Sequence, residues 1–231
     1  MIHGVDRNAV IVFDLDDTLY PEHDFVASGF QAVDEELRRR SIQGFFSTAQ
    51  KLFQGGLRGT VIDVALAQLG VETTPKLIAE LVEIYRSHNP RLQLFPDARW
   101  VLEHFGTTTK MGLLTDGFGR TQRNKVRALG LDSRFTATMY TDDLGPEQRK
   151  PSLVPFQKIA GALGMQDEPQ CLVYVADNPK KDFIAPNQLG WLTIRIQRGS
   201  GEYSALEPVE KNHAAKCEIH TLEQLPNILN S

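Results

Sequence analysis

The sequence predicts an α/β protein in which a parallel sheet has helices on both faces and a helical segment is inserted after the first strand. Short apolar runs rich in β-favouring residues recur along the chain, and amphipathic helical patterns separate the later ones. Strands that alternate with helices in this way form parallel sheets covered on both faces. The interval from about residue 22 to about residue 91 breaks this rhythm, because it contains helical patterns and no convincing strand.

The first apolar run, at residues 9–13, predicts a buried strand that ends at Asp14. Further strands are predicted at 111–114, 138–140, 172–175 and 192–194. Helices are predicted at 120–129, 152–163, 182–189 and 222–229 around the sheet, and at 25–40, 44–53, 60–69 and 74–87 in the insert. With 90–96 as the returning linker, we expect a core formed by residues 1–20 and 92–231 and a helical cap domain at 21–91.

The composition excludes several classes of partner. The chain of 231 residues has a formal net charge of -4, whereas a nucleic-acid surface needs clustered Lys and Arg. No apolar stretch approaches the ~20 residues that span a bilayer, and residues 1–8 are polar and lack a signal-peptide core. Two cysteines, Cys171 and Cys217, do not make a disulfide framework. We therefore expect a cytoplasmic protein that binds neither nucleic acid nor membrane; its oligomeric state is not specified.

Polar and charged side chains stand at the predicted strand ends, which meet at one edge of a parallel sheet. They are Asp14 and Asp16 after the first strand, Thr115, Asp116 and Gly117 after the second, Lys150 after the third, and Asp177 and Asp182 after the fourth. Carboxylates as close as Asp14 and Asp16 repel each other, and a divalent cation relieves that repulsion. Mg²⁺ takes one or two carboxylates, waters and substrate phosphate. A single Asp-x-Asp is more often a cap or an Asx turn, but the matching residues on other strands favour a magnesium site.

Taken together, four motifs in this sequence resemble those of the haloacid dehalogenase superfamily. They are Asp14-Leu15-Asp16-Asp17-Thr18, Thr115-Asp116-Gly117, Lys150, and Asp177-Asn178-Pro179-Lys180-Lys181-Asp182, in this order along almost the whole chain. The resemblance implies a Rossmann-like core with the first strand in a central position, and it implies that the insert is an α-helical cap of the C1 type. Ala176 stands where the family often has glycine, which is a small departure.

The resemblance also implies a phosphatase mechanism. Asp14 would be the nucleophile that forms an aspartyl-phosphate, and Asp16 would be the general acid and base. Lys150 would stabilise charge in the transition state. Mg²⁺ would be held by Asp14, by the backbone carbonyl of Asp16 and by Asp177.

Other motif residues receive supporting roles from the same resemblance. Thr115 and the backbone amide of Asp116 or Gly117 would bind the phosphoryl oxygens. Asp182 would support Lys150 and the metal-bound waters from outside the ligand set. Thr18 would brace the turn that holds Asp16.

The residue at position 16 separates branches of the superfamily. Dehalogenases lack an acid at the position of Asp16, phosphonatases have a small residue there, and membrane ATPases have Lys where this chain has Leu15. Asp16 therefore favours hydrolysis of a phosphate ester. A phosphosugar mutase retains this acid and stays open as an alternative, as does a non-catalytic binding module of the same fold. Sugar phosphates, nucleoside monophosphates and phosphoglycolate-like acids are all open as substrates, with a sugar phosphate or nucleotide favoured by the polar, glycine-rich loop at 55–59.

Three residues are candidates for substrate contact, and each has a simpler interpretation. Arg58 could hold an anionic or hydroxyl-rich leaving group, or be a surface arginine in a turn. His23 could hydrogen-bond the substrate, although a solvated or capping histidine is the more common case. Lys125 could reach toward the cap, whereas Gln122 is expected in the exposed first turns of a helix. The aromatic residues of the insert are expected to form its core; they are Phe25, Phe45, Phe46 and Phe53.

Overall fold

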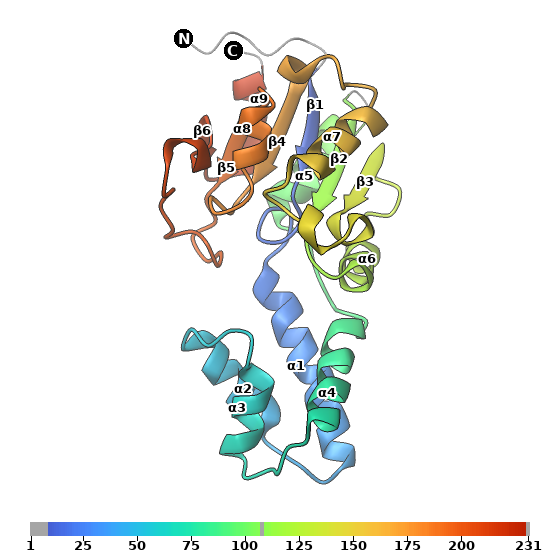
Figure 1. The fold of residues 1–231 in the computed structure, drawn as a ribbon, viewed down its shortest axis with the longest axis vertical. Helices are drawn as coiled ribbons and strands as arrows, with labels where there is room; N and C mark the ends of the chain where they lie inside the picture. The colour runs from blue at the N-terminus through green and yellow to red at the C-terminus, as the bar shows by residue number, and fades with distance from the viewer. Residues whose placement is uncertain (1–8, 107–108, 230–231) are drawn as a thin grey trace.

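The computed structural model describes residues 9–106 and 109–229, so the prediction for residues 1–8 lies outside the described residues. The described chain forms a sheet with helices on both faces and, beyond one edge of that sheet, a group of helices (Figure 1). No described helix combines the length and the apolar character that crossing a membrane requires.

A single parallel sheet with the strand order β3-β2-β1-β4-β5-β6 organises the core. Its strands are β1 (Val10–Phe13), β2 (Met111–Thr115), β3 (Ala137–Tyr140), β4 (Leu172–Ala176), β5 (Leu192–Ile196) and β6 (Cys217–Ile219). The prediction that the first strand is central is confirmed, because β1 pairs with β2 on one side and with β4 on the other. The edge strand β6 was not predicted, since its three residues include the exposed Glu218 and give too short an apolar signal.

The uninterrupted apolar sequence of β1 reflects burial on both faces. Ile11 and Phe13 point into one hydrophobic cluster, and Val10 and Val12 point into another, as the period of two along a strand requires. All four side chains are buried. This double burial is why no polar residue interrupts the run before Asp14.

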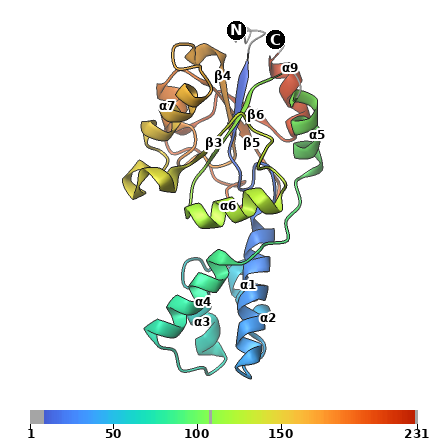
Figure 2. The ribbon, with the colours of Figure 1, turned by 90° about the vertical axis from the view of Figure 1, so that its right-hand side faces the viewer.

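Helices cover both faces of the sheet. Residues of α5 (Pro96–Phe105), α6 (Gly119–Ala128) and α9 (Leu225–Leu229) pack on the face with Phe13. Residues of α7 (Leu153–Ala162) and α8 (Ile184–Gln188) pack on the face with Val12. Figure 2 shows this division, with α7 on one side of the sheet and α5 and α9 on the other.

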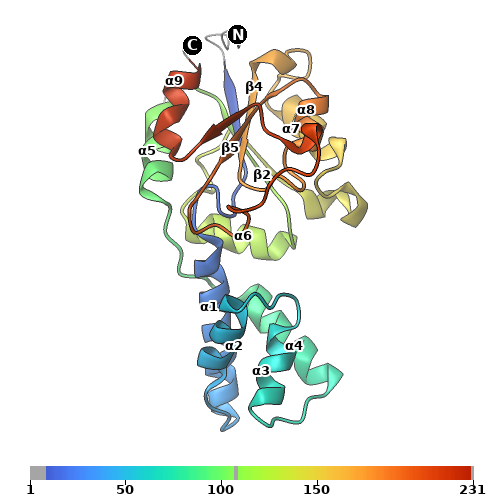
Figure 3. The same cartoon turned by 90° about the vertical axis from the view of Figure 1, so that its left-hand side faces the viewer.

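The helical insert has its own hydrophobic cluster. Its helices are α1 (Glu22–Arg39), α2 (Phe45–Gln54), α3 (Val61–Gln68) and α4 (Pro75–Ser87). Figure 3 shows them gathered beyond the carboxyl edge of the sheet. Phe45 is buried in this cluster, with Phe46 and Phe53 packed against it, as expected. The expectation for Phe25 was wrong: it belongs to the cluster of the sheet, because the first turn of α1 lies against the core.

The helix α5 was missed in the sequence, where 90–96 was taken as a linker and no helix was predicted after it. Pro96 occupies the first turn of α5, a position that suits its fixed φ and missing N–H. Asp97 then anchors the helix to the end of the chain. It accepts hydrogen bonds from Arg198 Nη1 at 2.7 Å, from Leu222 N at 2.8 Å and from Thr221 Oγ1 at 3.1 Å.

We expect Asp97→Ala to lower the free energy of unfolding by about 3 kcal/mol, because it leaves the nearly buried Arg198 without its counter-ion. Urea denaturation measures the change. Glu83→Gln is the matched control: it removes an ion pair with Arg120 whose side chains are 61% and 71% exposed, and should cost about 0.5 kcal/mol. Equal effects of the two substitutions would contradict the structural role of Asp97.

Candidate active site at the carboxyl edge of the sheet

The strand order brings the predicted motif residues together. Asp14, Thr115 and Asp177 stand at the ends of three adjacent parallel strands, β1, β2 and β4. The amide of Asp14 still donates to the carbonyl of Val175 at 2.9 Å, so Asp14 is held in register with β4. Because all the strands point the same way, their carboxyl ends define one edge.

Three buried carboxylates form a cluster at this edge. One oxygen each from Asp14, Asp177 and Asp182 lies within 4.8 Å of the others. Burial, together with the negative charge of Asp182, raises the pKa of Asp14 to about 7, although Lys150 acts in the opposite direction. Burial, followed by Asp182 and Asp14, raises the pKa of Asp177 well above its usual range. A divalent cation fits this donor set, because it would compensate carboxylates that otherwise resist ionisation together.

Lys150 lies against this cluster. Its ammonium group donates to Asp14 and, at 2.8 Å, to Asp182, and its side chain is fully buried. Asp182 also accepts from Tyr174 Oη at 3.3 Å and from Asn178 N at 3.2 Å. The structure thus places Asp182 beside Lys150, as the sequence predicted, and also within reach of the carboxylates that could hold a metal.

Asp116 connects three segments of the edge. Its carboxylate accepts from Thr141 Oγ1 at 2.5 Å, from the backbone amide of Lys150 at 3.4 Å and from Lys181 Nζ at 3.3 Å. The next residue, Gly117, has φ +131°, a conformation that L side chains rarely adopt. Lys181 was present in the fourth motif but was given no role; the structure shows it as a second cation near the site.

Asp16 has other partners than the carboxylate cluster of Asp14, Asp177 and Asp182. It accepts hydrogen bonds from Lys125 Nζ at 2.7 Å, from Gln122 Nε2 at 3.0 Å and from the Tyr20 hydroxyl. Burial opposes its ionisation, but Lys125 and the hydrogen bonds outweigh burial and lower the pKa of Asp16. That the backbone carbonyl of Asp16 is a metal ligand stays a prediction.

The expectation that Gln122 is exposed was wrong. Its side chain is buried and also donates to Thr115 Oγ1 at 2.5 Å. Helical periodicity gives the face of a helix but not what lies opposite it, and here the first turns of α6 face the strand ends. Lys125 lies on this same face, with its ammonium 4.3 Å from the ring centre of Phe25 at the start of α1.

The turn after β1 is braced mainly through backbone groups. The carbonyl of Thr18 accepts from Arg198 Nη2 at 2.7 Å, while the buried Thr18 hydroxyl has no hydrogen-bond partner among the described residues. Asp17 accepts from the amides of Glu22 and Glu202, both at 2.8 Å. Asp17 thereby ties the turn to the start of α1 and to the loop after β5.

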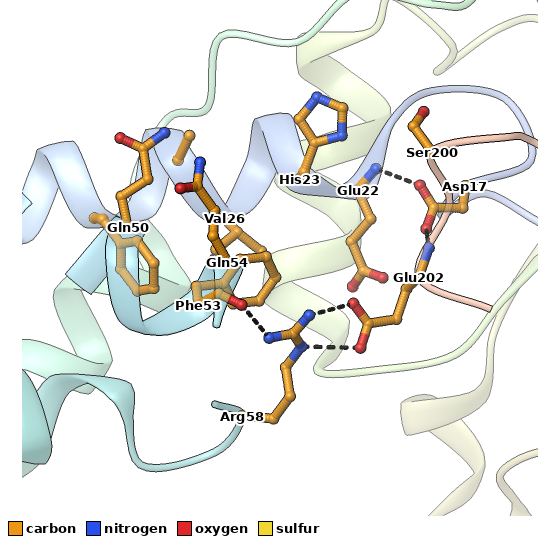
Figure 4. A pocket seen from close by; sticks show the side chains of 12 residues that line it. Asp17, Glu22, His23, Val26, Gln50, Phe53, Gln54, Arg58, Ser200 and Glu202 are labelled. Atoms are coloured by element: carbon orange, nitrogen blue, oxygen red, sulfur yellow. Dashed lines mark hydrogen bonds and ion pairs between the residues drawn. The ribbon is translucent and has the colours of Figure 1, made fainter. Parts of the chain in front are cut away.

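A pocket of about 280 Å³ lies between the insert and the loop after β5. Figure 4 shows Arg58 and Glu202 facing each other across it, with Glu22, His23 and Asp17 nearby. His23 lines the pocket, and its Nε2 lies 3.1 Å from Asp24. Arg58 binds Glu202 with two nitrogens. Glu22 lies in a segment, residues 20–23, that the sequence already offered as a candidate for substrate contact, and it begins α1. Glu202 was not predicted, because no motif marks a residue that reaches a pocket from the loop after β5.

The chain belongs to the haloacid dehalogenase-like hydrolase family, whose model matches residues 11–196. Among curated proteins it is similar to the glyceraldehyde 3-phosphate phosphatase of Methanopyrus kandleri, with 27% identity over 95% of this chain and 96% of the relative. The enzyme of the same name from Pyrococcus furiosus is 28% identical over 96% of this chain and 92% of its own. These relatives agree with the predicted class of phosphoric monoester hydrolase.

Solved structures confirm the predicted fold class. The HAD-hydrolase YfnB from Bacillus subtilis, solved with magnesium bound, has a TM-score of 0.71 at 19% identity and covers 98% of this chain and 100% of its own. The 2-haloacid dehalogenase of Pseudomonas syringae pv. Tomato has a TM-score of 0.63 at 24% identity, covering 96% and 97% of the two chains. The family and the fold class predicted from the sequence are therefore confirmed.

We expect Gln122→Ala to lower kcat by about tenfold or more, because Thr115 and Asp16 both lose a positioning hydrogen bond. Steady-state release of phosphate measures the effect. Arg127→Ala, at an exposed position of the same helix, is the control and should leave kcat unchanged. If Gln122 only faced solvent, as its sequence suggested, the two variants would behave alike.

Proposed function

We propose that the protein is a Mg²⁺-dependent phosphohydrolase that cleaves the phosphomonoester of a small molecule through an aspartyl-phosphate on Asp14. The observation behind this proposal is the buried cluster of Asp14, Asp177 and Asp182 in contact with Lys150. A sugar phosphate is the favoured substrate class. Glyceraldehyde 3-phosphate is the first compound to test, because three curated relatives are named for it.

The proposed metal ligands are the carboxylates of Asp14 and Asp177 and the backbone carbonyl of Asp16. Their fit rests on the raised pKa values of Asp14 and Asp177, which mark a place where added positive charge is favourable. When bound, Mg²⁺ would neutralise phosphoryl charge and keep Asp14 ionised. Asp182 lies close enough to support the site and balances Lys150 at the same time.

In the first proposed step, a carboxylate oxygen of Asp14 attacks phosphorus. The bond between phosphorus and the leaving oxygen breaks, and Asp16 gives that oxygen a proton. Lys150 compensates the negative charge that develops beside Asp14. Thr115 and the amide of Asp116 or Gly117 are the proposed ligands of the phosphoryl oxygens.

In the second step, water attacks the aspartyl-phosphate and the bond between phosphorus and Asp14 breaks. Asp16, now ionised, takes the proton of the water. The contacts of Asp16 with Lys125 and Gln122 favour this ionised form and hold its carboxylate in place, whereas they oppose the protonated form that the first step requires. Thr18 supports the same turn through its carbonyl.

We also propose that residues 21–91 act as the cap and that residues 1–20 and 92–231 form the catalytic core. The separate hydrophobic cluster of α1–α4 supports this division. His23 and Lys125 remain the residues proposed near the leaving group, whereas Arg58, offered with them, is paired with Glu202. The presence of only two cysteines is the reason to propose a cytoplasmic location.

Asp14→Asn should lower turnover by at least about a thousandfold, because it removes the attacking group. The assay is release of inorganic phosphate from a panel of phosphomonoesters that includes glyceraldehyde 3-phosphate. Asp63→Asn, at an exposed position of α3, is the matched control. Residual activity near wild type would refute the nucleophile, and an isomeric sugar phosphate in place of free phosphate would identify a mutase. An intact protein that releases phosphate from no ester would favour a binding module.

Removal of divalent cations with EDTA should abolish activity, and added Mg²⁺ should restore it. Mg²⁺ should also raise the melting temperature, because a cation that binds only the folded cluster stabilises it. Asp177→Asn should weaken this thermal shift, and Asp63→Asn should not. Full activity in chelator, or a shift that Asp177→Asn leaves unchanged, would exclude the metal site.

A further inference from the structure

The pocket between α1, α2 and the loop after β5 has an unusual arrangement of charged side chains. Of the described residues that line this pocket, Arg58 is the one arginine and is already paired, whereas the carboxylate of Glu22 beside it is not. The pocket of about 280 Å³ and a neighbouring one of about 330 Å³ share Glu22, Arg58 and Glu202, so these three side chains border both spaces. Asp17, the neighbour of Asp16 in the sequence, is one of the residues that line the pocket of about 280 Å³.

Each nitrogen of the Arg58 guanidinium already donates to the protein, so the one remaining N–H, on Nη2, cannot by itself form a two-nitrogen clamp on a substrate anion. Its Nε and Nη2 donate to the two carboxylate oxygens of Glu202 at 2.9 and 2.6 Å. Its Nη1 donates to the carbonyls of Phe53 and Leu57 at 2.6 and 2.9 Å, and its guanidinium lies 3.7 Å from the ring centre of Phe53. The two-nitrogen ion pair is the geometry that a substrate carboxylate or phosphate would itself adopt. Glu202 therefore takes the place of such an anion.

Glu22 is in the opposite situation. Among the described residues, none donates a hydrogen bond to its carboxylate or forms an ion pair with it, although its backbone amide is held by Asp17. Figure 4 shows its side chain extending from α1 toward the Arg58–Glu202 pair. Burial, followed by the charge of Asp16, raises the pKa of Glu22 to about 7. The same burial and neighbouring charge disfavour a second anion beside Glu22, although Lys125 and Lys181 act in the opposite direction.

We propose that Glu202, by occupying Arg58, makes this pocket select phosphomonoesters whose leaving group is neutral and hydroxylated, with Glu22 as the acceptor for a substrate hydroxyl. The proposal rests on the proposed phosphohydrolase function and narrows its substrate class. Leaving groups that bear a carboxylate or a second phosphate are rejected, because Glu22 repels them and Arg58, already paired with Glu202, cannot compensate. Arg58, which the sequence offered as a ligand of the leaving group, becomes instead the residue that Glu202 neutralises.

The test compares two probes with similar skeletons, 2-hydroxyethyl phosphate and 2-phosphoglycolate, which differ in a hydroxymethyl group and a carboxylate. Affinities are measured by calorimetry in the presence of Mg²⁺ with the Asp14→Asn protein, so that turnover is not required. We expect 2-hydroxyethyl phosphate to bind at least about tenfold more tightly than 2-phosphoglycolate. The carboxylate of 2-phosphoglycolate would be left without a partner in the pocket, and an unpaired charge costs about this much affinity.

Two further substitutions in the Asp14→Asn protein should move this preference in opposite directions. Glu202→Gln leaves the charge of Arg58 uncompensated and should reduce the preference by about tenfold. Arg58→Gln leaves Glu202 uncompensated and should increase it. Glu83→Gln, which removes a different ion pair between the insert and the core, is the matched control and should not change it.

Equal affinities for the two probes, or a preference that Glu202→Gln and Arg58→Gln do not shift in opposite directions, would overturn the inference. If one variant does not fold, the direction in which the other variant changes the ratio of the two affinities still supports or overturns the inference. Failure of the proposed function gives a different result. In that case the Asp14→Asn protein binds the probes with the expected preference, and the wild type releases no phosphate from either.

Discussion

The burial of Asp14 next to Asp182 depends on the charge of Lys150. Carboxylates removed from water are unfavourable unless they are paired, and Lys150 donates to both. Lys150 follows β3, which is two strands away from β1, so its segment must cross the end of β2. Asp116, at the end of β2, supports that crossing because it accepts the backbone amide of Lys150. The site is therefore assembled by strand order and then held by one buried cation.

The helix α6 connects the carboxyl edge of the sheet with the helical insert. Gln122 and Lys125 bind Asp16, while Thr121 and Asn124 of the same helix donate to backbone carbonyls of residues 86–88, at the end of α4 and just beyond it. One short helix thus contacts both the proposed acid and base and the exit of the insert. A displacement of the insert relative to the core would act on the groups that position Asp16, which links access to the site with its chemistry.

The sequence predicted the sheet and the motif residues well, because strand ends and acidic motifs give local signals. Its errors have physical causes. Gln122 was assigned to a solvated face, since periodicity cannot show that the first turns of α6 face the strand ends. Phe25 was assigned to the insert, although it packs on the sheet through the first turn of α1. Helix α5 was missed because Pro96 was taken as a break, whereas at the start of a helix it is favourable.

The pocket shows most clearly why the substrate could not be predicted. Arg58 and Glu202 are 144 residues apart, and only the fold brings them together. In sequence, Arg58 in a glycine-rich loop indicates anion binding; with its guanidinium filled by Glu202, it no longer offers a site for an anion. The selectivity for a leaving group therefore depends on residues of the insert and on the loop after β5 together. The formal charges of Glu22 and Arg58, the two charged residues that the insert contributes to the lining, cancel, so the negative charge of the pocket comes from Asp17 and Glu202 of the core.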